Sequence, residues 1–289
     1  MKAEIEVLQP GLFSSIQDLG RFGFQKYGVP QSGVMDRYAM RICNMVLGNY
    51  ENASVLEITM QGPHFKFYKT TSIAISGADF SAKINGKTIP LNERIKVSAG
   101  DELKFGSPAS GFRAYLGIHD GFISEELMDS KSWYEGLTEY SKLKKGMTLY
   151  YSPEKSKERD TFSSLKIDSD YIRSKKIEVF PGPEFDKLPE ELQKTLFDSD
   201  FTIEETSNRM AVQFREDFEN DLEAIITGPV MPGTVQLTPS GKMILLMRDC
   251  QTTGGYPRIL QLSEYGIQVL AQKIPGEKVY LDKKEYPDF

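Results

Sequence analysis

Short segments rich in apolar residues recur along the chain, bounded by Gly, Pro or Asn at close spacing, and in several of them apolar and polar residues alternate. A period of two is typical of strands that bury one face, and close spacing of such strands favours a β-barrel or sandwich. The clearest segments are residues 4–8, 72–76, 83–85, 94–97 and 114–118. The pattern therefore predicts a mainly β fold.

Helical periodicity is found in few places: residues 35–47, 189–196 and 267–272. In the first of these, apolar residues return near every 3.6 positions, as on the buried face of a helix. Asp36 stands at its start, where a carboxylate accepts hydrogen bonds from exposed backbone amides. We therefore expect three short helices, and helix capping is the structural interpretation of Asp36.

A chain of 289 residues is long enough for about two domains. Residues 153–176 are charged, rich in Ser and without apolar periodicity, which is typical of a linker or exposed excursion. This places an N-terminal β module at 1–152 and a C-terminal β module at 177–289. Four short motifs recur in the same order on both sides, among them Leu56-Glu57 and Leu222-Glu223, so we expect a duplicated pair of modules.

Charge and cysteine content limit the classes of function. Lys and Arg number 35 against 41 Asp and Glu, a net charge of −6 without a basic cluster, so neither nucleic acid nor a membrane surface is an expected partner. No run of 18 apolar residues occurs. With only Cys43 and Cys250, the chain lacks the spacing of a metal site, and we expect a reduced, cytoplasmic protein that binds no metal.

The first candidate cluster places an amide, a carboxylate and a guanidinium close together, in Gln17, Asp18, Gly20 and Arg21. Arg21 offers a planar fork for a carboxylate or phosphate, and Asp18 could orient Arg21 or accept a proton. The combination suits a substrate that carries an amide or a carboxylate. An Asp–Arg surface pair in a glycine-containing turn is the alternative.

The second candidate cluster follows an apolar segment and joins a carboxylate, an amide, two hydroxyls and two glycines. Such a sequence can form a cradle of donors for an oxyanion, a phosphate or a ureido ring, although a plain hairpin turn explains it too. The order of residues is not that of a phosphate-binding P-loop. The cluster comprises Asp249, Gln251, Thr252, Thr253, Gly254, Gly255 and Tyr256.

Four further residues carry weaker signals. Arg209 is a second forked cation, in Ser207-Asn208-Arg209-Met210. Glu57 and Glu223, at equivalent places in the two half-patterns, are either paired carboxylates or strand-edge charges, and for Glu223 a strand edge is favoured. Cys250 is expected to pack as a small apolar residue, since no His lies near it in sequence.

Taken together, these motifs resemble one family over nearly the whole chain: the KipA-like, or allophanate hydrolase subunit 2-like, family, whose bacterial members include the C subunit of 5-oxoprolinase. The motifs that carry the resemblance are Gln17-Asp18-x-Gly20-Arg21-x-Gly23, Gly28-Val29-Pro30-x-Ser32-Gly33-x-Met35-Asp36, Leu56-Glu57, Ser207-Asn208-Arg209-Met210 and Gln251-Thr252-Thr253-Gly254-Gly255-Tyr256-Pro257.

The resemblance implies cyclophilin-like β-barrel modules and the C subunit of an ATP-dependent 5-oxoprolinase, a hydrolase complex that opens 5-oxoproline to glutamate. Its partners would be a KipI-like B subunit and an A subunit of the same 5-oxoprolinase, with ATP as cosubstrate of the complex. Two alternatives stay open. One is a non-catalytic regulator that binds a KipI-like kinase inhibitor. The other is a biotin-dependent carboxyltransferase component acting on urea or a related amide, with biotin on a separate carrier.

Under this resemblance we expect catalytic roles for Asp18, Arg21 and Asp249. Arg21 and Arg209 would hold carboxylate or phosphate charge, while Asp18 or Asp249 would orient these groups or move a proton. The residues expected to bind a small amide or lactam substrate are Gln17, Gly20, Asp36, Glu57, Arg209, Gln251, Thr252, Thr253, Gly254 and Tyr256.

Three positions depart from the family pattern. Lys131 stands where the family has Arg, Ala211 where it has Gly, and Cys250 where it has Arg. Two of these changes remove a guanidinium fork, which leaves the identity of the substrate open.

Overall fold

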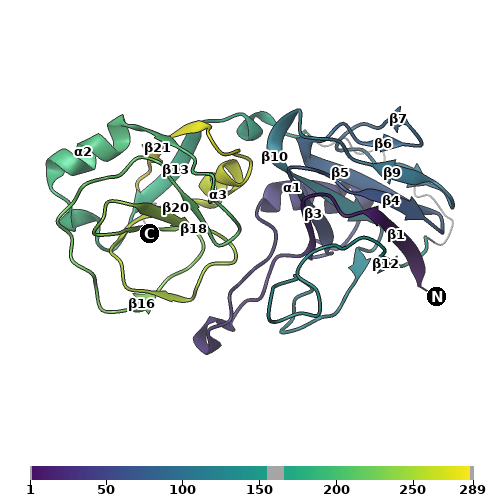
Figure 1. The fold of residues 1–289 in the computed structure, drawn as a ribbon, viewed down its shortest axis with the longest axis horizontal. Helices are drawn as coiled ribbons and strands as arrows, with labels where there is room; N and C mark the ends of the chain where they lie inside the picture. The colour runs from purple at the N-terminus through teal and green to yellow at the C-terminus, as the bar shows by residue number, and fades with distance from the viewer. Residues whose placement is uncertain (1, 155–165, 287–289) are drawn as a thin grey trace. The chain divides into compact units, whose positions relative to one another are not determined.

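The computed structural model describes residues 2–154 and 166–286, and the chain forms two compact units. The first unit comprises Met1–Gly20 and Asp36–Ile172, and the second comprises Arg21–Met35 and Arg173–Phe289. Figure 1 shows the strands and helices of each unit. No helix among the described residues is both long enough and apolar enough to span a bilayer.

The first unit is built from two antiparallel sheets. One has the order β11-β12-β1-β4-β9-β6-β7 and the other the order β2-β3-β10-β5-β8. Their strands are β1 (Ala3–Gln9), β2 (Phe13–Gln17), β3 (Val55–Thr59), β4 (His64–Phe67), β5 (Thr71–Asp79), β6 (Lys83–Ile84), β7 (Lys87–Thr88), β8 (Ile95–Val97), β9 (Glu102–Lys104), β10 (Ser110–Ile118), β11 (Phe122–Ile123) and β12 (Thr148–Tyr151).

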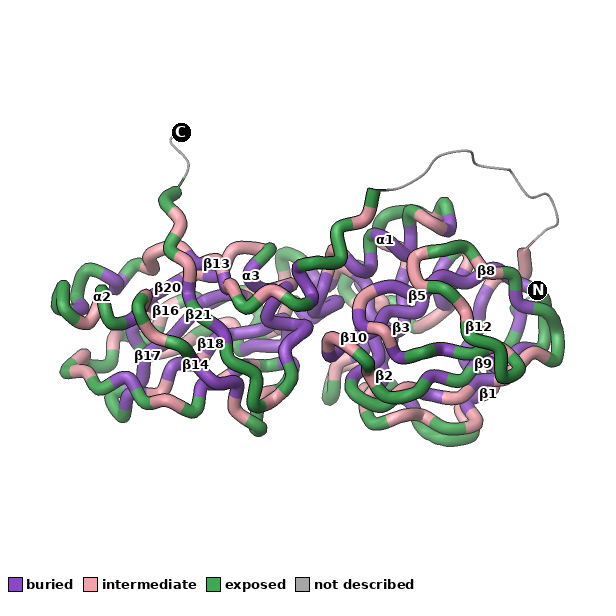
Figure 2. The backbone as a smooth tube through the Cα atoms, turned by 90° about the horizontal axis from the view of Figure 1, so that it is seen from above, coloured by how far each residue is buried: buried purple, intermediate pink, exposed green. Residues whose placement is uncertain are grey.

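The core of the first unit lies between these sheets. Alternate residues of β1 are buried, and Ile5 and Val7 join Phe65 of β4 in one apolar cluster. Leu56 of β3 and Leu116 of β10 enter the same cluster from the five-stranded sheet. Figure 2 shows that buried positions follow the strands, while exposed positions gather at the turns. Because side chains alternate along a strand, the neighbours of the core residues point to the other face of the five-stranded sheet.

Helix α1 (Arg37–Leu47) packs on β5 and β10, and two glycines let it approach. A Cβ at Gly117 would lie 2.9 Å from the Cβ of Cys43, and one at Gly77 would lie 3.4 Å from the Cβ of Ala39. The unit ends in a 3₁₀ helix, η2 (Asp170–Ile172).

The second unit contains one mixed sheet with the order β14-β21-β13-β20-β17-β18-β15, in which β13 and β21 run parallel. A two-stranded sheet pairs β16 with β19, helix α3 packs on β13 and β20, and α2 packs on β21. The elements are η1 (Gln25–Tyr27), β13 (Lys176–Pro181), η3 (Phe185–Lys187), α2 (Glu190–Asp198), β14 (Asp200–Thr202), β15 (Ala211–Gln213), β16 (Gly228–Pro229), β17 (Thr234–Leu237), β18 (Met243–Leu246), β19 (Thr253–Gly254), β20 (Arg258–Leu262), α3 (Glu264–Ala271) and β21 (Lys278–Lys283).

Residues 21–35 belong to the second unit although they lie far from it in sequence. The backbone N–H of Ser32 donates to the carbonyl of Arg248 at 2.9 Å, and Nη2 of Arg209 donates to the carbonyl of Gly33 at 2.7 Å. A single boundary between two continuous domains does not describe this arrangement, because the chain leaves the first unit after Gly20 and returns to it at Asp36.

The expected mainly β fold with few helices is confirmed, and each expected helix is present within a few residues of its expected bounds. Part of the expected excursion, residues 155–165, lies outside the described residues. Glu154 at its start joins the first unit, through Ser72 at 2.7 Å and Arg94 at 2.5 Å. The strand-edge interpretation of Glu223 is wrong, because residues 219–227 form no strand. Duplication of the modules stays a prediction.

Candidate functional site

The first unit gathers polar side chains on the face of its five-stranded sheet that points away from the core. The register places Glu57 of β3 between Ser15 of β2 and Tyr115 of β10, and Arg113 lies two residues before Tyr115. Burying so many polar groups is costly unless they are paired. We refer to Gln17, Glu57, Arg113 and Tyr115 as the polar set of the first unit.

Glu57 is fully buried and is held by its neighbours on β10. The Tyr115 hydroxyl donates to Glu57 Oε2 at 2.9 Å, and Arg113 Nε lies 3.8 Å from Glu57 Oε1. Burial raises the pKa of Tyr115 well above its usual value, and the negative charge of Glu57 raises it further. Tyr115 is therefore a neutral donor that fixes the orientation of the Glu57 carboxylate.

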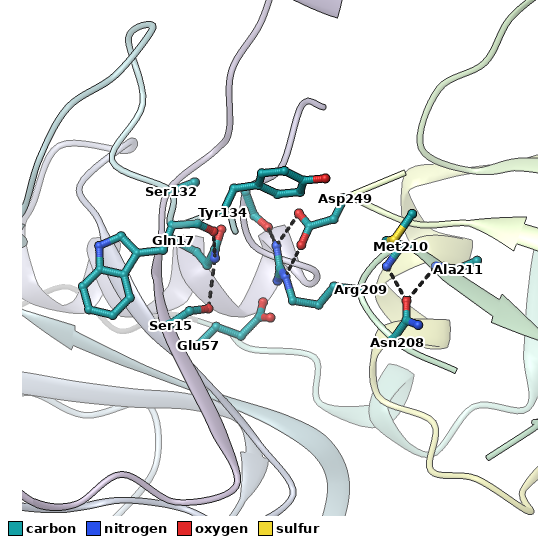
Figure 3. A network of polar contacts seen from close by, with 12 residues as sticks. Ser15, Gln17, Glu57, Ser132, Tyr134, Asn208, Arg209, Met210, Ala211 and Asp249 are labelled. Atoms are coloured by element: carbon teal, nitrogen blue, oxygen red, sulfur yellow. Dashed lines mark hydrogen bonds and ion pairs between the residues drawn. The ribbon is translucent and has the colours of Figure 1, made fainter. Parts of the chain in front are cut away.

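Gln17 uses both hydrogens of its amide inside the first unit. Its Nε2 donates to Ser15 Oγ at 2.9 Å and to the Trp133 carbonyl at 3.1 Å, as Figure 3 shows for Ser15. An amide has two N–H donors and one acceptor oxygen. These two bonds hold the Gln17 side chain in one orientation on this face of the sheet.

Asp18 holds together a turn that lies more than 110 residues further along the chain. Its Oδ1 accepts from the hydroxyls of Ser130 and Ser132 at 2.6 Å each, and its Oδ2 accepts from the Lys131 N–H at 2.6 Å. The Gly20 N–H donates to Oδ1 as well, at 2.8 Å. These four bonds, three of them to Oδ1, fix the orientation of the carboxylate, so the structure favours a positioning role for Asp18 over proton transfer.

Asp36 is the N-cap of α1, as the capping interpretation expects. Its Oδ1 accepts from the Ala39 N–H at 3.0 Å, and its Oδ2 accepts from the Tyr171 hydroxyl at 2.6 Å. The Asp36 N–H donates to the Tyr115 hydroxyl at 2.9 Å, so Asp36 also supports the polar set. With both carboxylate oxygens engaged inside the first unit, Asp36 is better placed to stabilise the site than to contact a substrate.

In the second unit, Asp249 fixes the guanidinium of Arg209. Asp249 Oδ2 accepts from Arg209 Nε at 2.8 Å and Oδ1 accepts from Nη2 at 3.0 Å, a bidentate pair in which each residue is 8% exposed (Figure 3). The preceding turn is closed by Asn208, whose Oδ1 accepts from the N–H groups of Met210 and Ala211. Bidentate geometry gives the guanidinium a fixed direction.

Arg21 is completely buried in the second unit, and Asp18 is 2% exposed in the first. The alternative interpretation of an Asp–Arg pair at the surface is therefore wrong. The backbone N–H of Arg21 donates to the Gln31 carbonyl at 2.6 Å, which closes the loop that carries it. A buried guanidinium is costly to desolvate, so its presence points to a role that an apolar residue could not fill.

The segment from Gln251 to Tyr256 is part of a small sheet and not an open cradle. Thr253 and Gly254 form β19, and the side chain of Gln236 lies against Gly254, where an added Cβ would meet its Nε2 at 2.4 Å. Gln251 Nε2 donates to Gln236 Oε1 at 3.4 Å. The Thr252 carbonyl accepts from the Val230 N–H at 3.0 Å, so the backbone of Thr252 takes part in the pairing of the two segments.

This segment does not match the P-loop type of nucleotide phosphate site. In a P-loop, the amides of a glycine-rich loop lead directly into a helix. Here the segment is followed by β20, and α3 begins only at Glu264. The segment therefore offers ATP no such site.

Both cysteines are buried thiols, as expected for Cys250. Burial raises the pKa of Cys250 to about 12, with a further contribution from the charge of Asp249, and burial raises that of Cys43 to about 11. A thiol with so high a pKa is a poor nucleophile at neutral pH. Among the described residues, no group of three or more His, Cys, Asp or Glu side chains is arranged to hold a metal ion.

Several contributors to these sites had been assigned no role from the sequence. Tyr115 lies in the predicted strand segment 114–118 and Arg113 directly precedes that segment, so the available signal is two long polar side chains two residues apart in an otherwise apolar strand. Tyr171 gives no comparable signal, because its partner Asp36 lies 135 residues away in the sequence.

Comparison with known proteins identifies relatives along nearly the whole chain. The family model of the carboxyltransferase domain, subdomain A and B, matches residues 27–283. The C subunit of 5-oxoprolinase from Escherichia coli (strain K12) is 31% identical over 284 residues, which cover 96% of this chain and 90% of that protein.

Solved structures with the same fold belong to larger chains. The K. lactis urea amidolyase is 28% identical with a TM-score of 0.81, covering 96% of this chain and 18% of its own. TTHA0988 is 24% identical with a TM-score of 0.83, covering 97% of this chain, which spans about half (55%) of TTHA0988. Since both the family model and the bacterial relative cover most of its length, the chain belongs to the carboxyltransferase domain family, subdomain A and B.

Proposed function

We propose that this chain is the C subunit of an ATP-dependent 5-oxoprolinase, active in a complex with a KipI-like B subunit and an A subunit. The observation that carries the proposal is the similarity to the C subunit of the E. coli 5-oxoprolinase, which extends over 96% of this chain and 90% of the relative. Such coverage leaves little of either chain without a counterpart. The proposed reaction is opening of the 5-oxoproline lactam to glutamate.

The groups that the proposed reaction presents can be compared with the buried polar residues of each unit taken separately. At neutral pH, 5-oxoproline carries a carboxylate, an amide N–H and an amide carbonyl. A guanidinium fixed by a carboxylate, as Arg209 is by Asp249, is the group best suited to recognise a carboxylate. We therefore assign to Arg209, in the second unit, the recognition of a carboxylate or phosphate group in the complex, and to Asp249 the role of orienting the Arg209 guanidinium.

The amide N–H of the lactam requires an acceptor. We assign this role to Glu57, because Tyr115 holds its carboxylate in one orientation and stays protonated. An anchored acceptor loses little conformational entropy when the substrate binds.

We assign ATP to the complex and not to a site on this chain. The glycine-rich segment at Gly254 is a strand packed by Gln236 and does not lead into a helix. The nucleotide would then be held by another component of the complex, while this chain contributes to binding and positioning the lactam.

The test is reconstitution of the three-component complex with omission of each component in turn. The proposal predicts ATP-dependent release of glutamate from 5-oxoproline only when this chain, the A subunit and the B subunit are all present. Turnover at the full rate without this chain would refute the proposal. A tight complex with the KipI-like partner that has no turnover, beside an active control complex, would instead favour a regulatory binding protein.

A biotin-dependent carboxyltransferase is the second candidate, favoured by the similarity to the K. lactis urea amidolyase over 96% of this chain. Because the chain spans only 18% of that protein, the activity would need a separate biotin carrier and carboxylase. Incorporation of labelled bicarbonate into urea, with a biotinylated carrier, a biotin carboxylase and ATP supplied, distinguishes this function from release of glutamate.

A further inference from the structure

The first unit contains a cavity of about 590 Å³ that includes none of the residues assigned to 5-oxoproline. Its walls come from β2, from the ends of β11 and β12 and from the loop between them. Ile16 lines it from β2, whereas the next residue, Gln17, belongs to the polar set on the opposite face of that strand. The cavity is therefore a separate site from the one proposed above.

Aromatic rings form one part of the wall. Trp133 is 5% exposed, and its indole N–H donates to Ser124 Oγ at 2.8 Å, which fixes the orientation of the ring. The centroids of the Trp133 and Tyr140 rings are 5.6 Å apart, and the two ring planes form an angle of 45°. Tyr150 lines the cavity as well. The faces of Trp and Tyr rings carry negative potential and attract cations.

Carboxylates form another part of the wall. Glu125 and Glu139 both line the cavity, and Glu125 Oε2 accepts from the Glu139 N–H at 3.1 Å, which holds the two residues together. A carboxylate with one such bond has acceptor capacity for further N–H donors. Aromatic faces combined with carboxylates are a chemical environment that selects a positively charged organic group.

The chain itself shows that one of these rings accepts an ammonium group. Lys2 Nζ lies 5.5 Å from the centroid of the Tyr150 ring, and Lys2 is a lining residue. A cavity of this size is larger than one lysine side chain needs and falls in the range of small-molecule sites. The ammonium of Lys2 is thus a competitor for part of the site.

From these contacts we propose that the cavity binds a small organic cation, an ammonium or guanidinium group on an alkyl chain. The ring faces of Trp133, Tyr140 and Tyr150 contact the cation and its alkyl chain. Glu125 and Glu139 neutralise the charge and accept its N–H donors. The proposal does not depend on the 5-oxoprolinase function.

Trp133 is the only tryptophan of the chain, so intrinsic fluorescence observes this cavity directly. The full-length protein is titrated with agmatine and with n-butylammonium, and 1-butanol serves as the neutral control. We expect a saturable change in emission with a dissociation constant near about 1 mM for agmatine, weakened by added salt, and no saturable change with 1-butanol. No saturation up to about 50 mM, or an equal response to 1-butanol, would overturn the proposal.

Variants of exposed residues test the roles of the wall. Glu125→Gln with Glu139→Gln should weaken agmatine binding at least about tenfold, whereas Glu135→Gln, an exposed carboxylate that does not line the cavity, should leave it unchanged. Lys2→Met should strengthen binding, because it removes the competing ammonium. Equal affinity in all four proteins refutes the assignment. Tighter binding of a blocked lysine tripeptide than of agmatine would assign the cavity to a protein side chain and contradict the small-molecule proposal.

Discussion

Replacing Asp249 by Asn tests how strongly the fixed guanidinium of Arg209 depends on its partner. The pair makes two charge-assisted hydrogen bonds, at 2.8 and 3.0 Å, with each residue 8% exposed. Asn keeps the shape and one acceptor oxygen but removes the charge, so Arg209 loses its neutralising partner in a largely dry site.

The size of the effect follows from burial. Hydrogen bonds to charged groups contribute about 1.5–3 kcal/mol each, and loss of one partner of a buried pair costs about 3–5 kcal/mol. Because Asn retains one bond, we expect Asp249→Asn to lower the free energy of unfolding by about 3 kcal/mol. For a urea dependence of about 2 kcal/mol per molar, the midpoint falls by about 1.5 M.

Urea unfolding followed by circular dichroism measures this shift, and Trp133 fluorescence, which observes the first unit, is recorded beside it. The matched control is Glu205→Gln, because Glu205 pairs with Arg215 at 3.2 Å in the same unit but the two side chains are 76% and 46% exposed. This control should change stability by no more than about 0.5 kcal/mol. If Asp249→Asn costs no more than Glu205→Gln, the reasoning from burial is wrong.

Three further predictions concern pH, thiol reactivity and packing. A hydrogen bond from Arg258 holds the pKa of Glu184 below its ordinary 4.5 in the folded protein, so this stabilisation is complete above pH 4.5 and is lost as the pH falls through the folded-state pKa. Glu184→Gln should therefore flatten the dependence of the urea midpoint on pH below 4.5. An unchanged slope would contradict this role of Glu184. Burial raises the pKa of Cys250 to about 12, so its thiol should react with iodoacetamide at pH 8 only as fast as the protein unfolds. Mass spectrometry of the labelled peptide measures this rate. Rapid labelling of the folded protein would contradict the burial of Cys250. Gly77→Ala should lower the free energy of unfolding by about 3 kcal/mol, because the added Cβ would lie 2.6 Å from the Arg113 carbonyl oxygen. Gly86→Ala, also at positive φ but in open space, should lower it by about 1 kcal/mol in the same unfolding assay. Equal losses in the two variants would contradict the role of close packing.

Features fixed by local sequence could be predicted. Asp36 lies directly before an apolar periodic segment, and its capping role depends only on amides within three residues. The strand predicted at residues 114–118 is a short, continuous apolar and aromatic run, and β10 contains it. The mainly β fold follows from many such local signals.

Features fixed by distant partners could not be predicted. Asp18 looks like a surface carboxylate next to a glycine, and only the fold brings the hydroxyls of Ser130 and Ser132 to its oxygen. Residues 21–35 carry no signal of the unit they join, because the bonds that hold them come from Arg209 and from the carbonyl of Arg248. The residues around Arg21 in the sequence therefore give no indication that its side chain is buried.

The central claim is that the polar set of the first unit serves the substrate, and Glu57→Gln in the reconstituted three-component complex tests it most directly. Glutamine keeps an acceptor for the Tyr115 hydroxyl but removes the charge that we assign to the lactam N–H. The control is Glu223→Gln. Glu223 is the residue that the recurring sequence motif places at the position equivalent to Glu57, but it lies in a segment outside any strand. The account predicts that kcat/KM for ATP-dependent glutamate release falls at least about tenfold in Glu57→Gln and stays at the wild-type value in Glu223→Gln. Wild-type kcat/KM in a folded Glu57→Gln complex would contradict it.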